Sequence, residues 1–166
     1  MRLHLKDLLS LANACSGFLA MAFFFLFGYL SAFVMVLLAM LADFLDGKVA
    51  RKQGKHDDFG VQLDSLADGV SFALAPAALV FFQHYPATAF AFFALLLAGL
   101  FYLSAGLVRL AEYNSQKEKG FYYGLPSPFA AFFVLLFGWI GVEAGAAVLL
   151  LAGVLMLSKF KLKKVF

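Results

Sequence analysis

The sequence predicts an all-α integral membrane protein with six transmembrane helices and both termini in the cytoplasm. Of its 166 residues, 64% are hydrophobic and only 14% are charged, whereas about a quarter of a soluble domain is charged. Apolar runs of the ~20 residues that span a bilayer follow one another along the chain. The composition excludes a water-soluble globule and a disordered chain, and it predicts a single membrane domain over residues 1–166.

Six apolar runs, separated by polar or helix-breaking residues, define the predicted helices. They cover residues 7–28, 30–53, 60–83, 87–114, 126–142 and 144–160. Glycine or proline interrupts the chain at Gly28, Pro86 and Gly141, where short turns are expected. The two longer breaks, 54–59 and 115–125, are polar. The runs show no alternation of the kind that a transmembrane barrel requires.

The positions of the basic residues predict the orientation. All 13 Lys and Arg residues lie before the first helix, around the breaks 54–59 and 115–125, or at the end of the chain. Because cytoplasmic segments carry the excess of positive charge, both termini are expected in the cytoplasm. An even number of spans requires the same arrangement. We therefore expect a multi-pass protein of the cytoplasmic membrane, and the small net charge of +3 gives no reason to expect a nucleic-acid partner.

Four aspartates lie inside the second and third predicted helices, close to their cytoplasmic ends: Asp43, Asp46, Asp64 and Asp68. An ionised carboxylate in the membrane interior costs ~2.5 to 3.5 kcal/mol even on the most lenient scale. We therefore expect these side chains to face a cavity and to meet cations. A single aspartate of this kind is equally well explained by a salt bridge near a helix end, but four together favour a site.

Helical periodicity places the aspartates of each helix on one arc with small residues. One arc holds Asp43, Asp46, Gly47 and Ala50, and the other holds Gly60, Asp64, Asp68 and Ser71. A short connection makes the two helices antiparallel neighbours, so the arcs can face each other. Since Mg²⁺ and Mn²⁺ prefer oxygen ligands, we predict two divalent cations between the helices. The small residues leave room for a bulky ligand, and Arg51 is placed to meet its phosphates.

A divalent-cation channel or transporter is the alternative from another functional class, because intramembrane carboxylates can line an ion path. The outer halves of the predicted helices, however, carry no charged residue except Glu143 at an outer turn. A continuous path would need more polar lining. The sequence therefore favours a site that opens on one side of the membrane only.

The spacing of these residues also resembles a known signature. Asp43-x-x-Asp46-Gly47-x-x-Ala50-Arg51, then eight residues, then Gly60-x-x-x-Asp64-x-x-x-Asp68 matches the CDP-alcohol phosphatidyltransferase family at every fixed position. The resemblance implies six transmembrane helices, a homodimer and two metal ions held by the four aspartates. It also implies that Asp68 is the general base for the incoming alcohol. Gly47, Ala50 and Gly60 would form the nucleotide cleft, with Arg51 on phosphate.

A finer resemblance points to the membrane-type phosphatidylserine synthases of bacteria and archaea. It rests on four strings: Asn13 to Ala20, Phe59 to Phe72, Ala75-Pro76, and Gly124 to Pro128 with Ala130 and Ala131. The resemblance implies transfer of a phosphatidyl-type group, diacyl or archaeol, from a CDP-linked lipid to the hydroxyl of L-serine, with release of CMP. Asn13 would hydrogen-bond the nucleotide or only cap neighbouring backbone.

The acceptor alcohol is the open part of this interpretation. A zwitterionic amino acid needs a cation for its carboxylate, and Arg109 is the first candidate; its alternative role is a structural pair with Glu112. Glu112 stands where the subgroup pattern has a second arginine. The same family with inositol phosphate or glycerol phosphate as acceptor is therefore the alternative, and Lys117, Lys119 and Arg109 would offer the extra cations that a phosphorylated acceptor needs.

Overall fold

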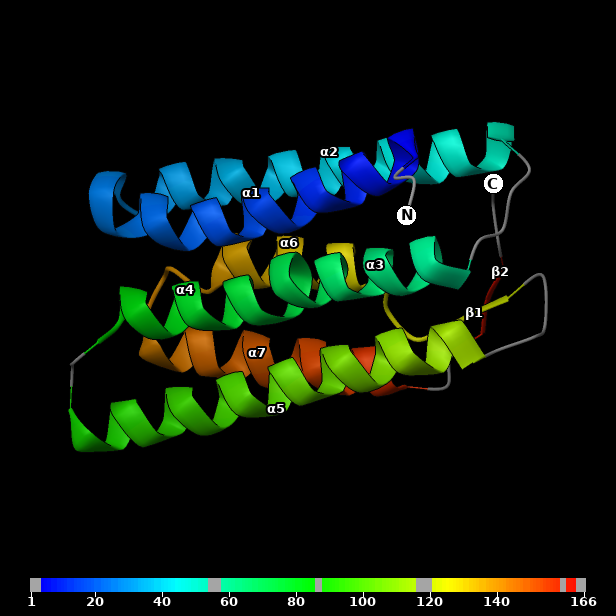
Figure 1. Cartoon of the computed structure of the whole chain (residues 1–166). Coiled ribbons are helices and arrows are strands. Elements are labelled where there is room, and N and C mark those ends of the chain that lie inside the picture. The colour runs from blue at the N-terminus through cyan, green and yellow to red at the C-terminus, as the bar shows by residue number, and fades with distance from the viewer. Residues whose placement is uncertain (1–3, 54–57, 86–87, 116–120, 159–160, 164–166) are drawn as a thin grey trace.

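The computed structural model describes residues 4–53, 58–85, 88–115, 121–158 and 161–163, which form a helical bundle and a ladder of two short strands (Figure 1). The elements are α1 (Leu5–Phe27), α2 (Tyr29–Gln53), α3 (Asp58–Asp68), η1 (Gly69–Leu74), α4 (Ala75–Gln83), α5 (Ala89–Ser115), β1 (Phe121–Tyr123), α6 (Ser127–Phe137), α7 (Val142–Leu157) and β2 (Lys161–Lys163). The segments α3, η1 and α4 follow one another without a break and form one rod. The six predicted helical segments are thus found in order.

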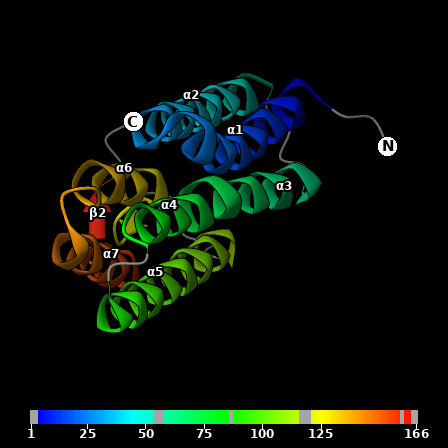
Figure 2. The ribbon, with the colours of Figure 1, turned by 90° about the vertical axis from the view of Figure 1, so that its left-hand side faces the viewer.

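The helices run roughly alongside one another (Figure 1). The start of α1, the end of α2, the start of α3 and the two strands lie toward one end of the bundle, while the α1–α2 turn, the end of α4 and the start of α5 lie at the other. Seen along the bundle, α1 and α2 form one layer, α3 and α4 lie with α6 in the middle, and α5 and α7 lie on the far side (Figure 2). The α1–α2 layer therefore covers the rod that carries Asp64 and Asp68.

Within the described residues, four helical segments are long and apolar enough to cross a membrane: Leu5–Phe27, Tyr29–Val49, Asp58–Gln83 and Ala89–Ser115. The last two helices are shorter than predicted. Helix α6 ends at Phe137, because the chain turns over the next four residues, and α7 has 16 residues and ends at Leu157. The apolar helical architecture is confirmed, and the length that spanning requires is shown for four helices.

The structure adds a short ladder that the sequence did not indicate. Strand β1 pairs antiparallel with β2, with Phe121 opposite Lys163. The sequence predicted a polar loop and a basic tail at these two places. Gly124 makes the approach possible: its φ is +70°, and a Cβ there would collide with carbonyl oxygens at the end of α7. The backbone N–H of Leu125 then donates to Leu155 O at 3.0 Å.

A π-helical turn, η1, interrupts the rod directly after Asp68. Its cause lies in Pro76, which has no N–H to donate and whose ring crowds the carbonyl four residues earlier, that of Phe72. The hydroxyl of Tyr102 on α5 donates to Phe72 O at 2.8 Å instead. A helix over 60–83 was predicted, and the structure adds this wider turn within it. Single π turns are frequent at functional sites.

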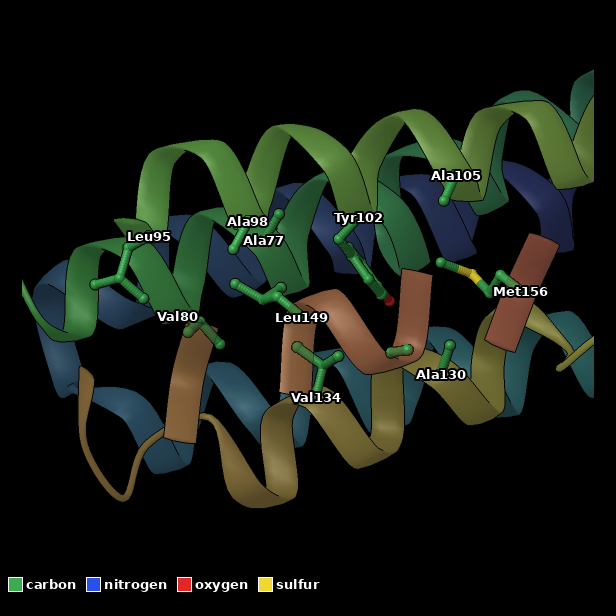
Figure 3. Close-up of a cluster of buried hydrophobic side chains, with 11 residues drawn as sticks. Ala77, Val80, Leu95, Ala98, Tyr102, Ala105, Ala130, Val134, Leu149 and Met156 are labelled. Atoms are coloured by element: carbon green, nitrogen blue, oxygen red, sulfur yellow. The ribbon is translucent and has the colours of Figure 1, made fainter. Parts of the chain in front are cut away.

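Tyr102 lies at the centre of the largest buried cluster, whose residues come from α4, α5, α6 and α7 (Figure 3). A second cluster joins α1 and α2 to the middle layer through Phe72, Leu79 and Leu135. Many of the buried positions are alanines, which let the helices approach closely. The packing fixes the middle rod between the two outer layers, and with it the two aspartates that the rod carries.

Candidate metal and substrate site

The four predicted aspartates come together at the interface of α2 and α3. Asp43, Asp64 and Asp68 each offer a carboxylate oxygen, and these oxygens all lie within 4.8 Å of one another. The carboxyl group of Asp46, which is 6% exposed, lies in contact with that of Asp64. The arcs inferred from helical periodicity therefore do face each other. Four acidic groups this close repel one another unless cations lie between them.

Helix α1 supports this cluster with hydrogen bonds. Asn13, which is fully buried, donates from Nδ2 to Asp68 Oδ1 at 2.8 Å. Its backbone carbonyl accepts a hydrogen bond from Ser71 Oγ at 2.8 Å. A Cβ at Gly17 would overlap Ser71, so glycine is needed for the close approach of α1 to η1. Asn13 was predicted to bind nucleotide or cap backbone, and the structure places it against Asp68.

Ser10 lies one turn before Asn13 and holds a second carboxylate. Its Oγ lies 3.1 Å from Asp46 Oδ2 and 3.2 Å from the backbone oxygen of Lys6. Sequence reasoning missed both Ser10 and Lys6. The signal was available, because Lys6, Ser10 and Asn13 recur at helical spacing along the most polar face of an otherwise apolar helix.

The two signature glycines have different surroundings. A Cβ at Gly47 would meet no described atom within 4 Å, so the described residues leave open space at this position. A Cβ at Gly60 would overlap the ammonium of Lys6 and lie 3.1 Å from Asp7 Oδ1. Gly60 thus makes room for a buried side chain of α1. Ala50 and Arg51 belong to the last turn of α2, and their side chains lie outside the described part of the structure.

The donor set suits hard divalent cations. Every candidate ligand atom is a carboxylate oxygen, the type that Mg²⁺ and Mn²⁺ prefer. Asp64 Oδ1 is buried and makes no hydrogen bond to any described residue, which is costly for a carboxylate unless a cation takes that place. The acidic triad of Asp43, Asp64 and Asp68 can therefore hold a metal ion.

Arg109 lies on α5, which packs on the side of the middle rod away from α1 (Figure 2). It is 8% exposed, and its Nη1 donates to the fully buried Ser127 Oγ at 2.9 Å. Ser127 opens α6 within the string Gly124 to Pro128 that the sequence analysis compared with the serine enzymes. Glu112 is exposed one turn further along α5. Asn114 Nδ2 donates to Ser65 Oγ at 2.7 Å, which ties the end of α5 to α3 beside Asp64.

Comparison with known proteins agrees with the signature. Archaetidylserine synthase of Methanothermobacter thermautotrophicus is 36% identical over 97% of this chain and 70% of its own length. The CDP-diacylglycerol–serine O-phosphatidyltransferase of Methanocaldococcus jannaschii is 34% identical over 96% of this chain and 74% of its own. The yeast enzyme of that name is 37% identical, over 76% of this chain and 50% of its own length.

A solved structure supports the fold. Mycobacterium tuberculosis phosphatidylinositol phosphate synthase with CDP-DAG bound superposes with a TM-score of 0.66 at 19% identity, covering 91% of this chain and 80% of the other. The profile of the CDP-alcohol phosphatidyltransferases matches residues 3–159, nearly the whole chain, and it includes all four clustered aspartates. The chain belongs to the CDP-alcohol phosphatidyltransferase family.

Proposed function

We propose that this protein transfers a phosphatidyl-type group from a CDP-linked lipid to the hydroxyl of L-serine and releases CMP. The observation that carries the proposal is the convergence of Asp43, Asp46, Asp64 and Asp68 between α2 and α3, in the spacing of the family. The names of the archaeal and yeast relatives support serine as the acceptor. Those names include both diacylglycerol and archaeol lipids, so we propose a phosphatidyl-type group of either kind.

The four aspartates would hold two divalent cations, Mg²⁺ or Mn²⁺. Bound there, the cations would neutralise the pyrophosphate and ease the departure of CMP. The open space beside Gly47 fits the nucleotide cleft that the resemblance implies, in which we also place Ala50, Arg51 and Gly60. Asn13 Oδ1 is buried and has no hydrogen-bond partner among the described residues, so it is available as an acceptor for a substrate N–H or O–H.

Asp68 is the proposed general base. Asn13 occupies its Oδ1, which leaves Oδ2 to take the proton from the serine hydroxyl. The hydroxyl oxygen attacks the phosphorus that carries the lipid, and a new P–O bond forms while the P–O bond to CMP breaks. The proton goes to Asp68, and the bonding electrons leave with CMP. Because a carboxylate is a weak base for an alcohol, proton removal accompanies the attack, and positioning supplies most of the acceleration.

Arg109 is the proposed partner of the serine carboxylate. The side chain of Arg109 is buried and donates a hydrogen bond to Ser127 at the start of α6. A guanidinium can bind a carboxylate through two parallel hydrogen bonds. A phosphorylated acceptor such as inositol phosphate or glycerol phosphate would need further cations. Glu112, exposed one turn further along the same helix, offers a carboxylate and not the cation that such an acceptor needs.

The decisive experiment is CMP release by the detergent-purified protein. CDP-diacylglycerol and CDP-archaeol are supplied in turn with Mg²⁺ or Mn²⁺, and L-serine, inositol phosphate and glycerol 3-phosphate are tested separately. We expect CMP with serine only, and none after chelation by EDTA. CMP with another acceptor keeps the mechanism and rejects serine. No CMP with any pair of substrates rejects the transferase proposal.

We further propose that all six helical rods cross the cytoplasmic membrane and that the site faces the cytoplasm. The start of α1, the strand β2 and the aspartate-bearing ends of α2 and α3 lie toward the same end of the bundle (Figure 1). A fluorescent-protein fusion after Ser158 should fluoresce, and a phosphatase fusion there should be inactive. Phosphatase fused after Gly141, in the opposite turn, should be active. The reverse pattern contradicts this topology.

Following the family resemblance, we propose that the protein is a homodimer in the membrane. Each chain would carry a complete set of aspartates, because the four come from α2 and α3 of one chain. Cross-linking in native membranes, followed by gel electrophoresis, should give a band at twice the mass of the 18.1 kDa chain. Only monomer over a range of cross-linker concentrations contradicts the proposal.

A further inference from the structure

Lys6 is a buried cation that has no role in the reaction proposed above. Its side chain is 8% exposed, although lysine is almost never buried unless it is paired. The ammonium lies against the backbone of α3, where a Cβ at Gly60 would overlap it and would lie 2.9 Å from its Cε. Gly60 lies one helical turn before Asp64 on α3, so the ammonium lies near that carboxylate and the two opposite charges attract each other.

Lys6 belongs to a row of three polar residues along one face of α1. Three residues at helical spacing lie toward the carboxylate cluster: the Lys6 ammonium lies against Gly60, one turn before Asp64, Ser10 contacts Asp46, and Asn13 contacts Asp68. Ser10 also lies 3.2 Å from the backbone oxygen of Lys6, so the first two positions are coupled. Of the three, Lys6 alone brings a positive charge.

A structural pair with Asp7 explains Lys6 less well. Asp7 is 1% exposed, and its Oδ2 accepts a hydrogen bond from the backbone N–H of His4 at 2.8 Å, as a helix cap. Its Oδ1 makes no hydrogen bond to any described residue, Lys6 included. The Lys6 ammonium and Asp7 Oδ1 thus both lie beside Gly60, but no hydrogen bond between described residues ties the ammonium to that oxygen.

We propose that Lys6 is a fixed cation of the active site, which binds a phosphate of the CDP-linked donor and, before the donor arrives, competes with divalent cations for Asp64. This inference rests on the proposed function and adds a donor-binding residue from α1 to it. A fixed positive charge repels free metal ions and attracts the anionic donor. When the charge is removed, the affinity for free metal ions should therefore rise and the affinity for the donor should fall.

The test compares Lys6→Met with Lys6→Arg, which keeps the charge. The affinity for Mn²⁺ in the absence of donor is obtained from the free Mn²⁺ signal in electron paramagnetic resonance. The binding of CMP and of CDP-diacylglycerol is measured at saturating Mn²⁺. In Lys6→Met we expect Mn²⁺ to bind about tenfold more tightly and both nucleotide ligands about tenfold more weakly, as loss of one nearby unit charge implies. Lys6→Arg should stay within about threefold of the unmutated protein on both measurements.

Lys48→Met is the matched control. Lys48 is exposed on α2, and its Nζ lies 4.2 Å from the centre of the Phe44 ring. The variant removes the same charge from the same end of the bundle and should leave both affinities unchanged, because solvent screens an exposed charge. If Lys48→Met reproduces the effect of Lys6→Met, the overall electrostatic field of the protein sets the two affinities and the buried Lys6 charge does not. The inference is then wrong.

The remaining outcomes are also decisive. If Mn²⁺ and nucleotide affinities both fall in Lys6→Met, the lysine has a structural role, and if neither changes it has no role in binding. Should Lys6→Met fail to fold, Lys6→Gln keeps a polar side chain at the same place and must show the same opposite shifts. If the unmutated protein binds neither Mn²⁺ nor a CDP-linked lipid, the proposed function fails, which is distinct from failure of the Lys6 proposal alone.

Discussion

Asn13 on α1 donates a hydrogen bond from Nδ2 to Asp68 Oδ1 at 2.8 Å, and both side chains are buried. The bond joins the outer layer to the middle rod at the residue that we propose as the base. It also makes the two oxygens of Asp68 unequal, since one is engaged and the other is available. The orientation of the base therefore depends on a helix outside the aspartate signature.

Asn13→Ala should lower turnover while the fold persists. A hydrogen bond to a charged group contributes ~1.5 to 3 kcal/mol, which corresponds to a loss of about 10- to 100-fold if it acts on the transition state. The measurement is the rate of CMP release at saturating substrates, together with the melting temperature. Ser71→Ala is the control: it removes the bond to the Asn13 backbone, so it should cost about 1 kcal/mol of stability and little turnover. Unchanged turnover in Asn13→Ala contradicts the orienting role.

Asp68→Asn should separate binding from chemistry. The amide has the shape of the carboxylate and its oxygen can still accept from Asn13, so metal-dependent binding of the CDP-linked lipid should largely persist. Turnover should fall by about 10²- to 10⁴-fold, the usual contribution of a general base. Binding of donor with Mn²⁺ and CMP release are measured on the same preparation. Full activity in this variant removes Asp68 as the base.

The sequence predicted the aspartate cluster well because the relevant geometry is local. Helical periodicity alone puts Asp43 and Asp46 on one arc and Asp64 and Asp68 on another, and a short connection brings the arcs together. The support from α1 could not be predicted with the same certainty. Which face of α1 meets α3 depends on the close contact of Gly17 with Ser71, residues 54 positions apart in the sequence.

The errors of prediction have similar causes. Pro76 was visible in the sequence, but the π turn before it depends on Tyr102, which accommodates the displaced Phe72 carbonyl from another helix. The β1–β2 ladder pairs residues about 40 positions apart, and no alternation in either short strand indicates it. The early ends of α6 and α7 follow from this ladder and from the turn after Phe137, which helix periodicity does not determine.

Two glycine-to-alanine variants should have opposite effects on stability. Gly17→Ala places a methyl group against the backbone of Ser71 at 2.7 Å, so it should push α1 away from η1 and lower the melting temperature. Gly47→Ala meets no described atom within 4 Å and should raise helix stability, by up to ~1 kcal/mol. If the open space is the nucleotide cleft, Gly47→Ala should nevertheless weaken CMP binding. Unchanged CMP binding would assign the cleft elsewhere.

Tyr102→Phe should destabilise the protein without changing the metal site. The substitution keeps the ring in its buried cluster and removes only the hydroxyl that donates to Phe72 O. Leaving that carbonyl unsatisfied costs ~1 to 3 kcal/mol. The melting temperature in detergent should fall, while the Mn²⁺ affinity stays near that of the unmutated protein. A large loss of Mn²⁺ affinity would instead mean that the π turn controls the position of Asp68.

Arg109→Lys should raise the KM for serine and leave the KM for the CDP-linked lipid nearly unchanged. A lysine keeps the positive charge but cannot form two parallel hydrogen bonds with a carboxylate, so a loss of about tenfold or more in serine affinity is expected. Ser127→Ala keeps the guanidinium and removes its 2.9 Å contact, and its effect on the serine KM should be smaller. Both variants are assayed by CMP release with each substrate varied in turn. If the KM for the lipid rises as much as that for serine, Arg109 acts on the shared structure of the site and another residue must hold the serine carboxylate.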